Sequence, residues 1–553
     1  MSSNPSPAVA ALLSFLFPGA GQIYAGETRK GLIWAIPMFL FVIGVIWILA
    51  GGTLGMLQLV DSAEKRLALL TLNIAFFLYH VAAMLDAYAV AQRARSGSFG
   101  SSRTSGAAPI VLAGLVSVAI ILHGLPEVYG VQFHNAYSNI APGRTNVIPQ
   151  ASFGTLPPTT PTPLTSATPT PEPSDPGATP DGTPGPTPNG SGPVETAGPK
   201  VCPPQVDLAS WPGWAQDGRI NILVAGTDSR SDEGVSDNSL RTDTMLLMSI
   251  DIQNCKAAMF SFPRNMCTPS INGSCGPAGS ESRYPDFLQI PLPPESAGAY
   301  PNGVFPDMLN ALWRRAAENP AFPGSEGVGQ ECAQQFDCTR AWRALTGTIQ
   351  QMAGQNIDGI VSVNLKGFTS LVDNLPEQCV AKDLRVQLGN KDCYGGVWIN
   401  APQAIHDDVY HTSQQELIEV DIPKGCHYFD SEMALAYSRS RHESSDYDRA
   451  RRQQYVLQQM RKQLDPIALL PHIPTLLGVA QENLFMTFSD ADVPYLAEAA
   501  SRIDAERMYR WDFSPNRTTQ AGSMQGIRDK VGNIFSEPEP DPEQDNLGKC
   551  PPR

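Results

Sequence analysis

Five arginines lie within seventeen residues of this chain, in the stretch SRSRHESSDYDRARRQQ at 438–454, although the whole chain carries a formal net charge of −15. Arg439 and Arg441 are two residues apart, so in extended backbone their side chains would point to the same side. Guanidinium groups match the paired oxygens of phosphates. The pattern therefore favours a phosphate site, and the alternative is a solvated, salt-bridged helix face.

The second half of this stretch is typical of the start of a helix. Arg449, Arg452 and Gln453 are three and four residues apart there and are expected to share one helix face. The N-terminus of a helix is itself favourable to anions. Converging donors of this kind would bind a di- or polyphosphate.

Carboxylates and further arginines lie next to three apolar, β-rich runs at 219–226, 244–252 and 257–263. The loop between the first two runs carries Asp228, Arg241 and Asp243, and Arg264 directly follows the third run. In open α/β sheets, ligands bind at strand ends of this kind. Carboxylate oxygens suit Mg²⁺ or Mn²⁺. The four side chains therefore predict a site for a metal ion together with a phosphate.

The elements that must position these side chains alternate between strand and helix. Helical patterns follow the strands, in FPDMLNALWRRAAEN, CTRAWRALTGTIQQMAG and DYDRARRQQYVLQQMRKQL. This alternation predicts an α/β/α layered domain with a central mixed sheet, over residues 206–516.

The first 130 residues are typical of a membrane region. Three apolar runs, at about 31–52, 67–91 and 108–126, are long enough to cross a bilayer as helices. The loop between the second and third runs carries Arg93, Arg95 and Arg103 and no acidic residue, which places it in the cytoplasm. Everything after the third span is then extracytoplasmic. A fourth span at 8–31 would invert this topology.

Two segments have few apolar residues to bury. Residues 131–205 are rich in Pro and Thr and are expected to be a disordered linker, and residues 517–553 a mostly disordered tail. Such a linker could reach on the order of 150 Å when extended as polyproline II.

All ten cysteines follow the membrane region, the first being Cys202. An even number in one part of a long chain indicates disulfides and an oxidising compartment. Sequence-local pairs are Cys379–Cys393, Cys267–Cys275 and Cys332–Cys338. Cys202–Cys550 would tie the ends of the domain together and leave Cys255 and Cys426, although connectivity cannot be deduced from sequence.

The excess of acidic over basic residues, 54 against 39, argues against nucleic acid as a partner. The motifs NILVAGTDSR, LRTDTMLLMSID, FSFPRN and ALAYSRSRHESSDYDRARRQQ, in this order, resemble the LytR–CpsA–Psr family of bacterial cell-wall proteins over roughly 220–513. The resemblance implies an enzyme anchored in the bacterial cytoplasmic membrane. It would transfer a glycopolymer from a polyprenyl-pyrophosphate carrier to peptidoglycan or another wall acceptor, with Mg²⁺.

The same resemblance implies roles for individual residues. Asp228 and Asp243 would flank the metal and, with Arg241 and Arg264, be catalytic. The pyrophosphate would be held by Arg241, Arg264, Arg439, Arg441, Arg449, Arg452 and Gln453.

This chain departs from the family pattern at Asn265, where Pro-Arg-Asp is usual, and it has insertions at about 266–306 and 376–394. Two other functions stay open at this point. One is a polyprenyl-pyrophosphate phosphatase, and the other is a non-catalytic, membrane-anchored sensor of lipid phosphates.

Overall fold

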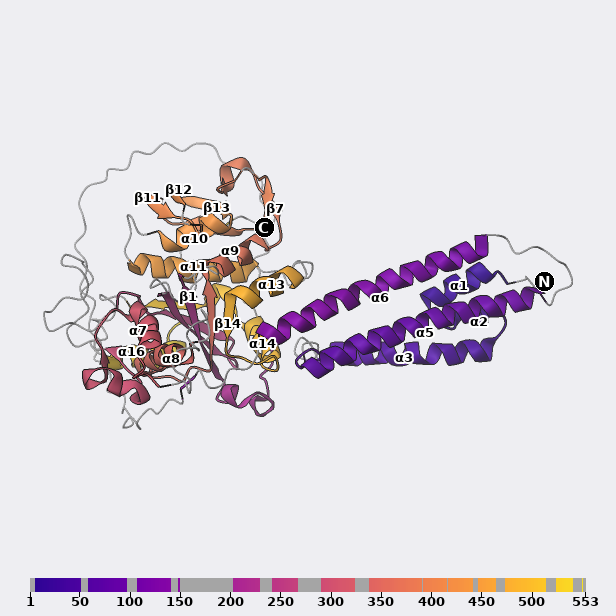
Figure 1. The fold of residues 1–553 in the computed structure, drawn as a ribbon, viewed down its shortest axis with the longest axis horizontal. Coiled ribbons are helices and arrows are strands. Elements are labelled where there is room, and N and C mark those ends of the chain that lie inside the picture. Colours follow the sequence, from indigo (N-terminus) through magenta and orange to yellow (C-terminus); the bar gives the residue numbers. More distant parts are fainter. Residues whose placement is uncertain are drawn as a thin grey trace.

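The structure is a computed structural model in which a bundle of long helices carries an α/β domain at one end (Figure 1). It describes residues 5–50, 58–96, 107–140, 148–149, 202–228, 241–266, 290–323, 338–389, 391–414, 416–440, 446–463, 473–513, 524–540 and 550.

The domain is built on a six-stranded mixed sheet with the order β14-β6-β1-β2-β3-β15. β1 pairs parallel with β6 and antiparallel with β2, so the first two strands of the domain lie side by side at its centre. The strands of this sheet are β1 (Arg219–Thr227), β2 (Thr242–Asp251), β3 (Lys256–Ser261), β6 (Gly359–Asn364), β14 (Leu484–Met486) and β15 (Tyr509–Asp512).

Alternate residues of the central strands enter two different cores, because successive side chains of a strand point to opposite faces. Leu223, Met245 and Phe260 pack into the core on one face. Leu246 and Met259 pack into the core on the other. The sheet is therefore covered on both sides, as the uninterrupted apolar runs predict.

Helices form the two outer layers. The first face is covered by α7 (Leu312–Glu318), α8 (Thr339–Ala353) and α16 (Met524–Asn533). The second face is covered by α11 (Asp446–Gln463) and α14 (Val493–Arg502). The predicted α/β/α domain with a central mixed sheet is confirmed.

A second, smaller layer packs beside α11. It comprises α9 (Leu365–Asp373), α10 (Ser431–Arg439), the sheet of β8 (Arg385–Val386), β10 (Val397–Ala401) and β13 (Gly425–Phe429), and the hairpin of β11 (Ile405–His411) and β12 (Leu417–Ile422). Its apolar core joins these strands to α9, α10 and α11. Short pairs β4 (Ile290–Pro291) with β5 (Val304–Phe305), and β7 (Gln378–Cys379) with β9 (Cys393–Tyr394), lie within the two expected insertions.

The C-terminal segment differs from the prediction of a mostly disordered tail. α16 buries Ile527 and Val531 in the first core, and Ile534 follows them. These three apolar residues recur at four and three positions, which is a helical spacing that the surrounding polar sequence masked. The domain therefore extends beyond the expected boundary at 516.

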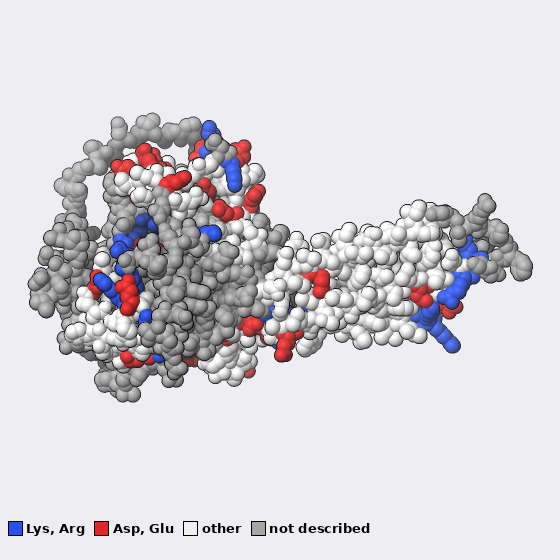
Figure 2. All heavy atoms as spheres, viewed as in Figure 1, with Lys and Arg blue, Asp and Glu red and all other residues white. Residues whose placement is uncertain are grey.

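The N-terminal region contains three long apolar helices where the spans were expected. The helices α3 (Thr28–Ala50), α5 (Ala63–Ser96) and α6 (Ala107–Ile140) are long and apolar enough to cross a membrane. On the face seen in Figure 2, most Lys, Arg, Asp and Glu side chains of the bundle lie towards its two ends.

Two short helices, α1 (Pro7–Leu16) and α2 (Ala20–Tyr24), pack against α5 instead of forming a fourth long helix. The turn between them depends on glycine. Gly19 has a φ of 101°, and a Cβ at Gly21 would lie 2.0 Å from the backbone O of Ala10.

The domain docks directly on the bundle. α6 packs against α13 (Ile473–Asn483) and β14. Arg66 at the start of α5 is 3% exposed, and its Nη2 lies 3.1 Å from Asp490 Oδ2. Gln58 Nε2 donates to Tyr495 Oη at 3.5 Å. Gln58 and Arg66, at the end of the bundle next to the domain, thus form polar contacts with the domain.

Both ends of the predicted linker, 131–205, are structured. α6 continues to Ile140, and Ile148 packs against the first core. At the other end, Arg502 Nη2 donates to Pro204 O at 2.8 Å. Ile148 buries apolar surface against the domain, which offsets an ordering cost that the Pro-Thr repeat cannot.

The disulfide prediction is partly right. Cys379–Cys393 is present, but Cys202 pairs with Cys255 and Cys426 with Cys550, so Cys202–Cys550 was wrong.

The observed pairing has a local cause. Val206 and Gln253 exchange hydrogen bonds, which hold the entry of the domain beside the β2–β3 turn that carries Cys255. Cys338 is disulfide-bonded, and Cys267, Cys275 and Cys332 lie outside the described residues.

One half-buried carboxyl group, that of Asp358, predicts how stability depends on pH. Asp358 Oδ2 accepts from Asn221 N at 2.7 Å where β1 and β6 begin. Burial, with Asp217 nearby, raises its pKa to about 7. Since the folded pKa lies above the unfolded value, its stabilising contribution is complete below about pH 4 and is lost as the pH rises towards 7.

Between pH 4 and 7, ionisation of Asp358 should lower the free energy of unfolding by about 2–4 kcal/mol. We expect Asp358→Asn, which keeps an acceptor oxygen, to remove this part of the pH dependence. Thermal unfolding of the detergent-solubilised protein across this range measures it, with the exposed Asp383→Asn as the matched control. Parallel profiles for wild type and Asp358→Asn would contradict the assignment.

Candidate active site

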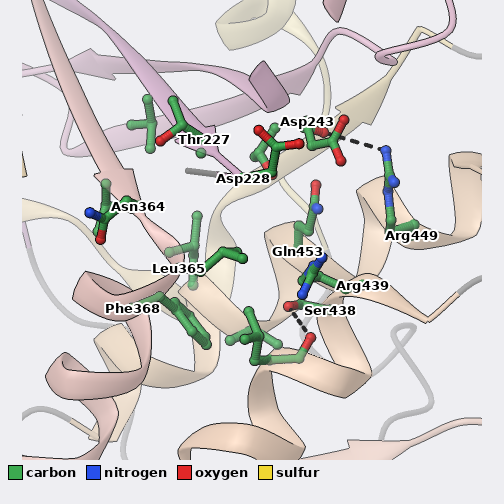
Figure 3. Close-up of a pocket in the computed structure, with 17 residues that line it drawn as sticks. Thr227, Asp228, Asp243, Asn364, Leu365, Phe368, Ser438, Arg439, Arg449 and Gln453 are labelled. Atoms are coloured by element: carbon green, nitrogen blue, oxygen red, sulfur yellow. Dashed lines mark hydrogen bonds between the residues drawn. The ribbon is translucent and has the colours of Figure 1, made fainter. Parts of the chain in front are cut away.

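A pocket opens between the ends of β1, β2 and β6 and the helices α9, α10 and α11 (Figure 3). It is lined by Val224, Gly226, Thr227, Asp228, Asp243, Thr244, Val363, Asn364, Leu365, Phe368, Leu435, Ser438, Arg439, Arg449, Gln453, Val456 and Leu457.

The pocket is divided by chemistry. Leu365 and Phe368 of α9, with Leu435 of α10 and Leu457 of α11, form an apolar interior. The polar groups come from the strand ends and from the ends of α10 and α11 that face them. A ligand that fills this pocket would need an apolar body and an anionic head.

Asp243, the second residue of β2, accepts hydrogen bonds through both its side chain and its backbone. Its Oδ1 accepts from Arg264 Nη1 at 2.9 Å and from Asn310 Nδ2 at 3.3 Å. Arg449 Nη2 donates to its backbone O at 3.4 Å. Burial alone would raise the pKa of Asp243, but Arg264, Arg449 and Asn310 together lower it. Asp243 is therefore held as an anion.

Asp228 follows β1 and faces Asp243. Its Oδ1 accepts from Arg241 N at 2.6 Å, and its own N–H donates to Arg241 O at 3.2 Å. Burial and the neighbouring Asp243 raise the pKa of Asp228 to about 6. The two carboxylates thus have different environments, although the sheet places them together.

These carboxylates fit a divalent cation. Asp243 uses only Oδ1 for Arg264 and Asn310, so its Oδ2 can still be a ligand. A cation would also relieve the repulsion that raises the pKa of Asp228. Within the described ranges no group of three or more His, Cys, Asp or Glu could hold a metal. Any Mg²⁺ would take its other ligands from water and from substrate phosphate, as Mg²⁺ usually does.

Three of the predicted phosphate ligands line the pocket. Arg449 and Gln453 are four residues apart on α11, and Arg439 is the last residue of α10. Arg439 therefore ends a helix and is not in the extended segment that the Arg-x-Arg spacing suggested. Its guanidinium carbon lies 5.8 Å from the centre of the Tyr410 ring.

Arg452 does not line the pocket and has a structural role. Its Nε donates to Tyr437 O at 2.7 Å, and its Nη2 donates to Ser440 O. Arg452 lies three residues after Arg449 on α11, and its side chain points towards the C-terminal end of α10. It satisfies carbonyls that the helix end leaves unpaired and thereby fixes Arg439 in place.

The remaining predicted residues lie around the carboxylates or outside the description. Arg264 approaches Asp243 with a side chain that is 15% exposed. Arg241 is exposed, and its charge acts on Asp228. Arg441 lies outside the described residues.

A second, more polar cavity shares Asp243, Arg439 and Arg449 with the pocket and is also lined by residues of the β11–β12 hairpin. Asp407 there is buried, and its Oδ2 accepts from Ser440 Oγ at 2.7 Å. The sequence patterns did not predict that this hairpin and the apolar residues of α9 line the site. The hairpin sequence IHDDVYH carries acidic and aromatic residues at strand spacing, but only the fold places them beside Arg439.

Arg439 and Arg452 make a matched pair for mutation. Arg452→Met would leave two buried carbonyls unpaired, so we expect a loss of about 3 kcal/mol or more in the free energy of unfolding. Arg439→Met should cost less than about 1 kcal/mol of stability, since this arginine is half-buried at the pocket mouth. It should lower affinity for inorganic pyrophosphate about tenfold or more, because it removes a charge-assisted contact.

Thermal melts and pyrophosphate titrations of both variants measure these effects. Equal losses of stability in the two variants would contradict the separation of roles.

Comparisons with known proteins agree with this architecture. A model of the LytR_cpsA_psr family matches residues 195–281 and 342–533. Among curated proteins, none matches the chain in sequence.

Similar solved structures include gbs0355 from Streptococcus agalactiae, with 18% sequence identity, a match that covers 53% of this chain and 77% of that chain, and a TM-score of 0.35. B. subtilis TagV has 16% sequence identity, a match that covers 58% of this chain and 98% of that chain, and a TM-score of 0.34. TagT bound to LIIa-WTA has 17% sequence identity, a match that covers 60% of this chain and 94% of that chain, and a TM-score of 0.31. The family model covers half of the chain and extends through α16. The protein therefore belongs to the LytR_cpsA_psr family, whose members are known as cell-wall glycopolymer transferases.

Proposed function

We propose that the protein transfers a glycopolymer from a polyprenyl-pyrophosphate carrier to a cell-wall acceptor such as peptidoglycan, with Mg²⁺, outside the cytoplasmic membrane. The observation that carries this proposal is the divided pocket. Apolar side chains of α9, α10 and α11 adjoin the polar mouth of the pocket. This mouth is formed by two carboxylates and two arginines: Asp228, Asp243, Arg439 and Arg449. An amphiphile with a pyrophosphate head matches both parts, whereas a soluble phosphate ester would leave the apolar part empty.

Each part of the mouth has a task in this reaction. Arg439 and Arg449, with Gln453, would bind pyrophosphate oxygens. Asp228 and Asp243 would hold the Mg²⁺, which supplies neutralisation of charge on the leaving phosphate. Arg264 and Asn310 orient Asp243 through its Oδ1 and leave its second oxygen for this purpose.

The transfer itself breaks the bond between the two phosphates. An acceptor hydroxyl attacks the phosphorus that carries the glycan, a new phosphorus–oxygen bond forms, and polyprenyl phosphate leaves. The hydroxyl proton passes to a nearby carboxylate. The cavity beside Asp407 opens on the same arginines and gives an acceptor room to approach.

The membrane region would hold the pocket near the lipid carrier. Arg93 and Arg95 lie at the end of α5 opposite Arg66, and Arg29 and Lys30 lie at the start of α3, where Lys30 pairs with Asp86 of α5. These basic residues favour a cytoplasmic location for the end of the bundle away from the domain. The domain is then extracytoplasmic, in agreement with its disulfides. α13 bridges α6 and α9, so one wall of the pocket is connected to a membrane helix.

The purified full-length protein should be assayed with a polyprenyl-pyrophosphate-linked glycan and a wall acceptor, with and without Mg²⁺. The proposal expects glycan on the acceptor. Free phosphate instead would identify a phosphatase, and stoichiometric binding without product would identify a sensor.

Asp243→Asn tests the role of the metal ligands. We expect turnover with Mg²⁺ to fall at least about a hundredfold, since one ligand and one charge are lost. Binding of the pyrophosphate lipid without Mg²⁺ should be unchanged or tighter, because the arginines lose a competing anion.

Asp251→Asn, at the opposite end of β2, is the matched control and should keep its activity. Unchanged turnover in Asp243→Asn would contradict the assignment.

A further inference from the structure

Polar side chains form a seam between α5 and α6 inside the bundle. Arg66, Asn73 and His80 lie seven residues apart on α5, a spacing that keeps them on one helix face. On antiparallel α6 they meet His134, Glu127 and His123. Ionisable residues within membrane spans are expensive and are found where they have a function.

The inner part of the seam is a continuous chain of contacts. His80 Nε2 lies 2.7 Å from Phe15 O of α1, and His80 Nδ1 lies 3.5 Å from His123 Nε2. His123 Nδ1 lies 2.9 Å from Asn73 Oδ1. Asn73 Nδ2 donates to Glu127 Oε2 at 2.9 Å.

The orientation of the Asn73 amide follows from its partners. Its nitrogen also donates to the backbone O of His123 at 3.0 Å. The reversed amide would place its oxygen against a carbonyl and a carboxylate, both of which only accept. Asn73 Oδ1 must therefore face His123 Nδ1 as an acceptor.

Counting donors then fixes the protonation of the two rings. Phe15 O only accepts, so His80 Nε2 must carry a hydrogen. Asn73 Oδ1 also accepts, so His123 Nδ1 must carry one as well. If both rings are neutral, His80 Nδ1 and His123 Nε2 face each other with a lone pair each and no hydrogen between them. One additional proton between them turns this contact into an imidazole–imidazolium hydrogen bond.

Aromatic rings and one carboxyl group surround the histidine pair. Phe15 stacks on His80 with 5.5 Å between ring centres, and Phe76 and Phe77 lie 6.0 and 5.7 Å from the His123 ring. Aromatic faces attract cations. Glu127, joined to His123 through Asn73, supplies the opposite charge.

Other charged groups around the seam have their own partners. On α3 and α5, Lys30 pairs with Asp86 towards the far end of the bundle. At the near end, Arg66 pairs with Asp490. From α1, the described contact to the seam is the Phe15 backbone and ring.

We propose that His80 and His123 form a proton-binding site inside the membrane bundle, with Asn73 fixing the ring orientation and Glu127 as counter-charge. At 1.5 Å per residue the site lies roughly 10–20 Å below Arg66, the residue that docks the catalytic domain. The bundle is thus more than an anchor, since it holds an exchangeable proton beneath the docking ion pair. This role is independent of the reaction proposed for the domain.

Nitrogen NMR of histidine-labelled full-length protein in lipid nanodiscs tests the proposal, with signals assigned by His80→Gln and His123→Gln. At neutral pH we expect three of the four ring nitrogens of this pair to be protonated. Two neutral rings in the wild type would overturn the proposal.

Asn73→Leu should abolish the imidazolium signal, because His123 can then change tautomer and donate to neutral His80. Glu127→Gln should reduce it at least tenfold. Thr71→Leu, on the same helix but exposed, is the matched control and should leave it unchanged. An imidazolium signal that persists in Asn73→Leu, with helix content equal to wild type, would also overturn the proposal.

Discussion

The charge balance at Asp243 is the interaction on which the site depends. Arg264 and Arg449 bring two largely buried positive charges to one end of the sheet, and the Asp243 carboxylate compensates both. The carboxylate thus offsets a repulsion between the two guanidinium groups that would otherwise be uncompensated. A phosphate ligand and a cation can share these charges, so the arrangement that holds the site together is also the one that would receive a substrate.

The fold supplies this arrangement through neighbouring elements. β1 and β2 pair at the centre of the sheet and bring Asp228 and Asp243 side by side, and α11 crosses the same edge with Arg449 and Gln453. Arg452 connects α11 to the end of α10 through Tyr437 O and Ser440 O. Gly226 is required at this edge, since a Cβ there would lie 2.9 Å from Thr244 Cβ. Packing and charge therefore place the polar mouth directly above the apolar interior.

Sequence patterns predicted most of the fold, because apolar strands and amphipathic helices have distinct periods. They also predicted that Asp228, Asp243, Arg439 and Arg449 would converge. Arg452 shows the limit of that reasoning. It is an arginine on the same helix as Arg449, but it lies on a different side of that helix and donates to backbone carbonyls instead of lining the pocket. Long-range pairings such as Cys426–Cys550, and the hairpin beside Arg439, depend on tertiary contacts that no local period encodes.

The central claim is that one pocket recognises an apolar chain and a pyrophosphate together. The most direct measurement compares three ligands on the full-length protein in nanodiscs: a polyprenyl pyrophosphate, inorganic pyrophosphate and the corresponding polyprenol. The account predicts that the polyprenyl pyrophosphate binds at least about a hundredfold more tightly than either part, since charge-assisted contacts and apolar burial each contribute a few kcal/mol. Equal affinity for the polyprenol and the polyprenyl pyrophosphate would show that the arginines do not bind the head group and would contradict the account.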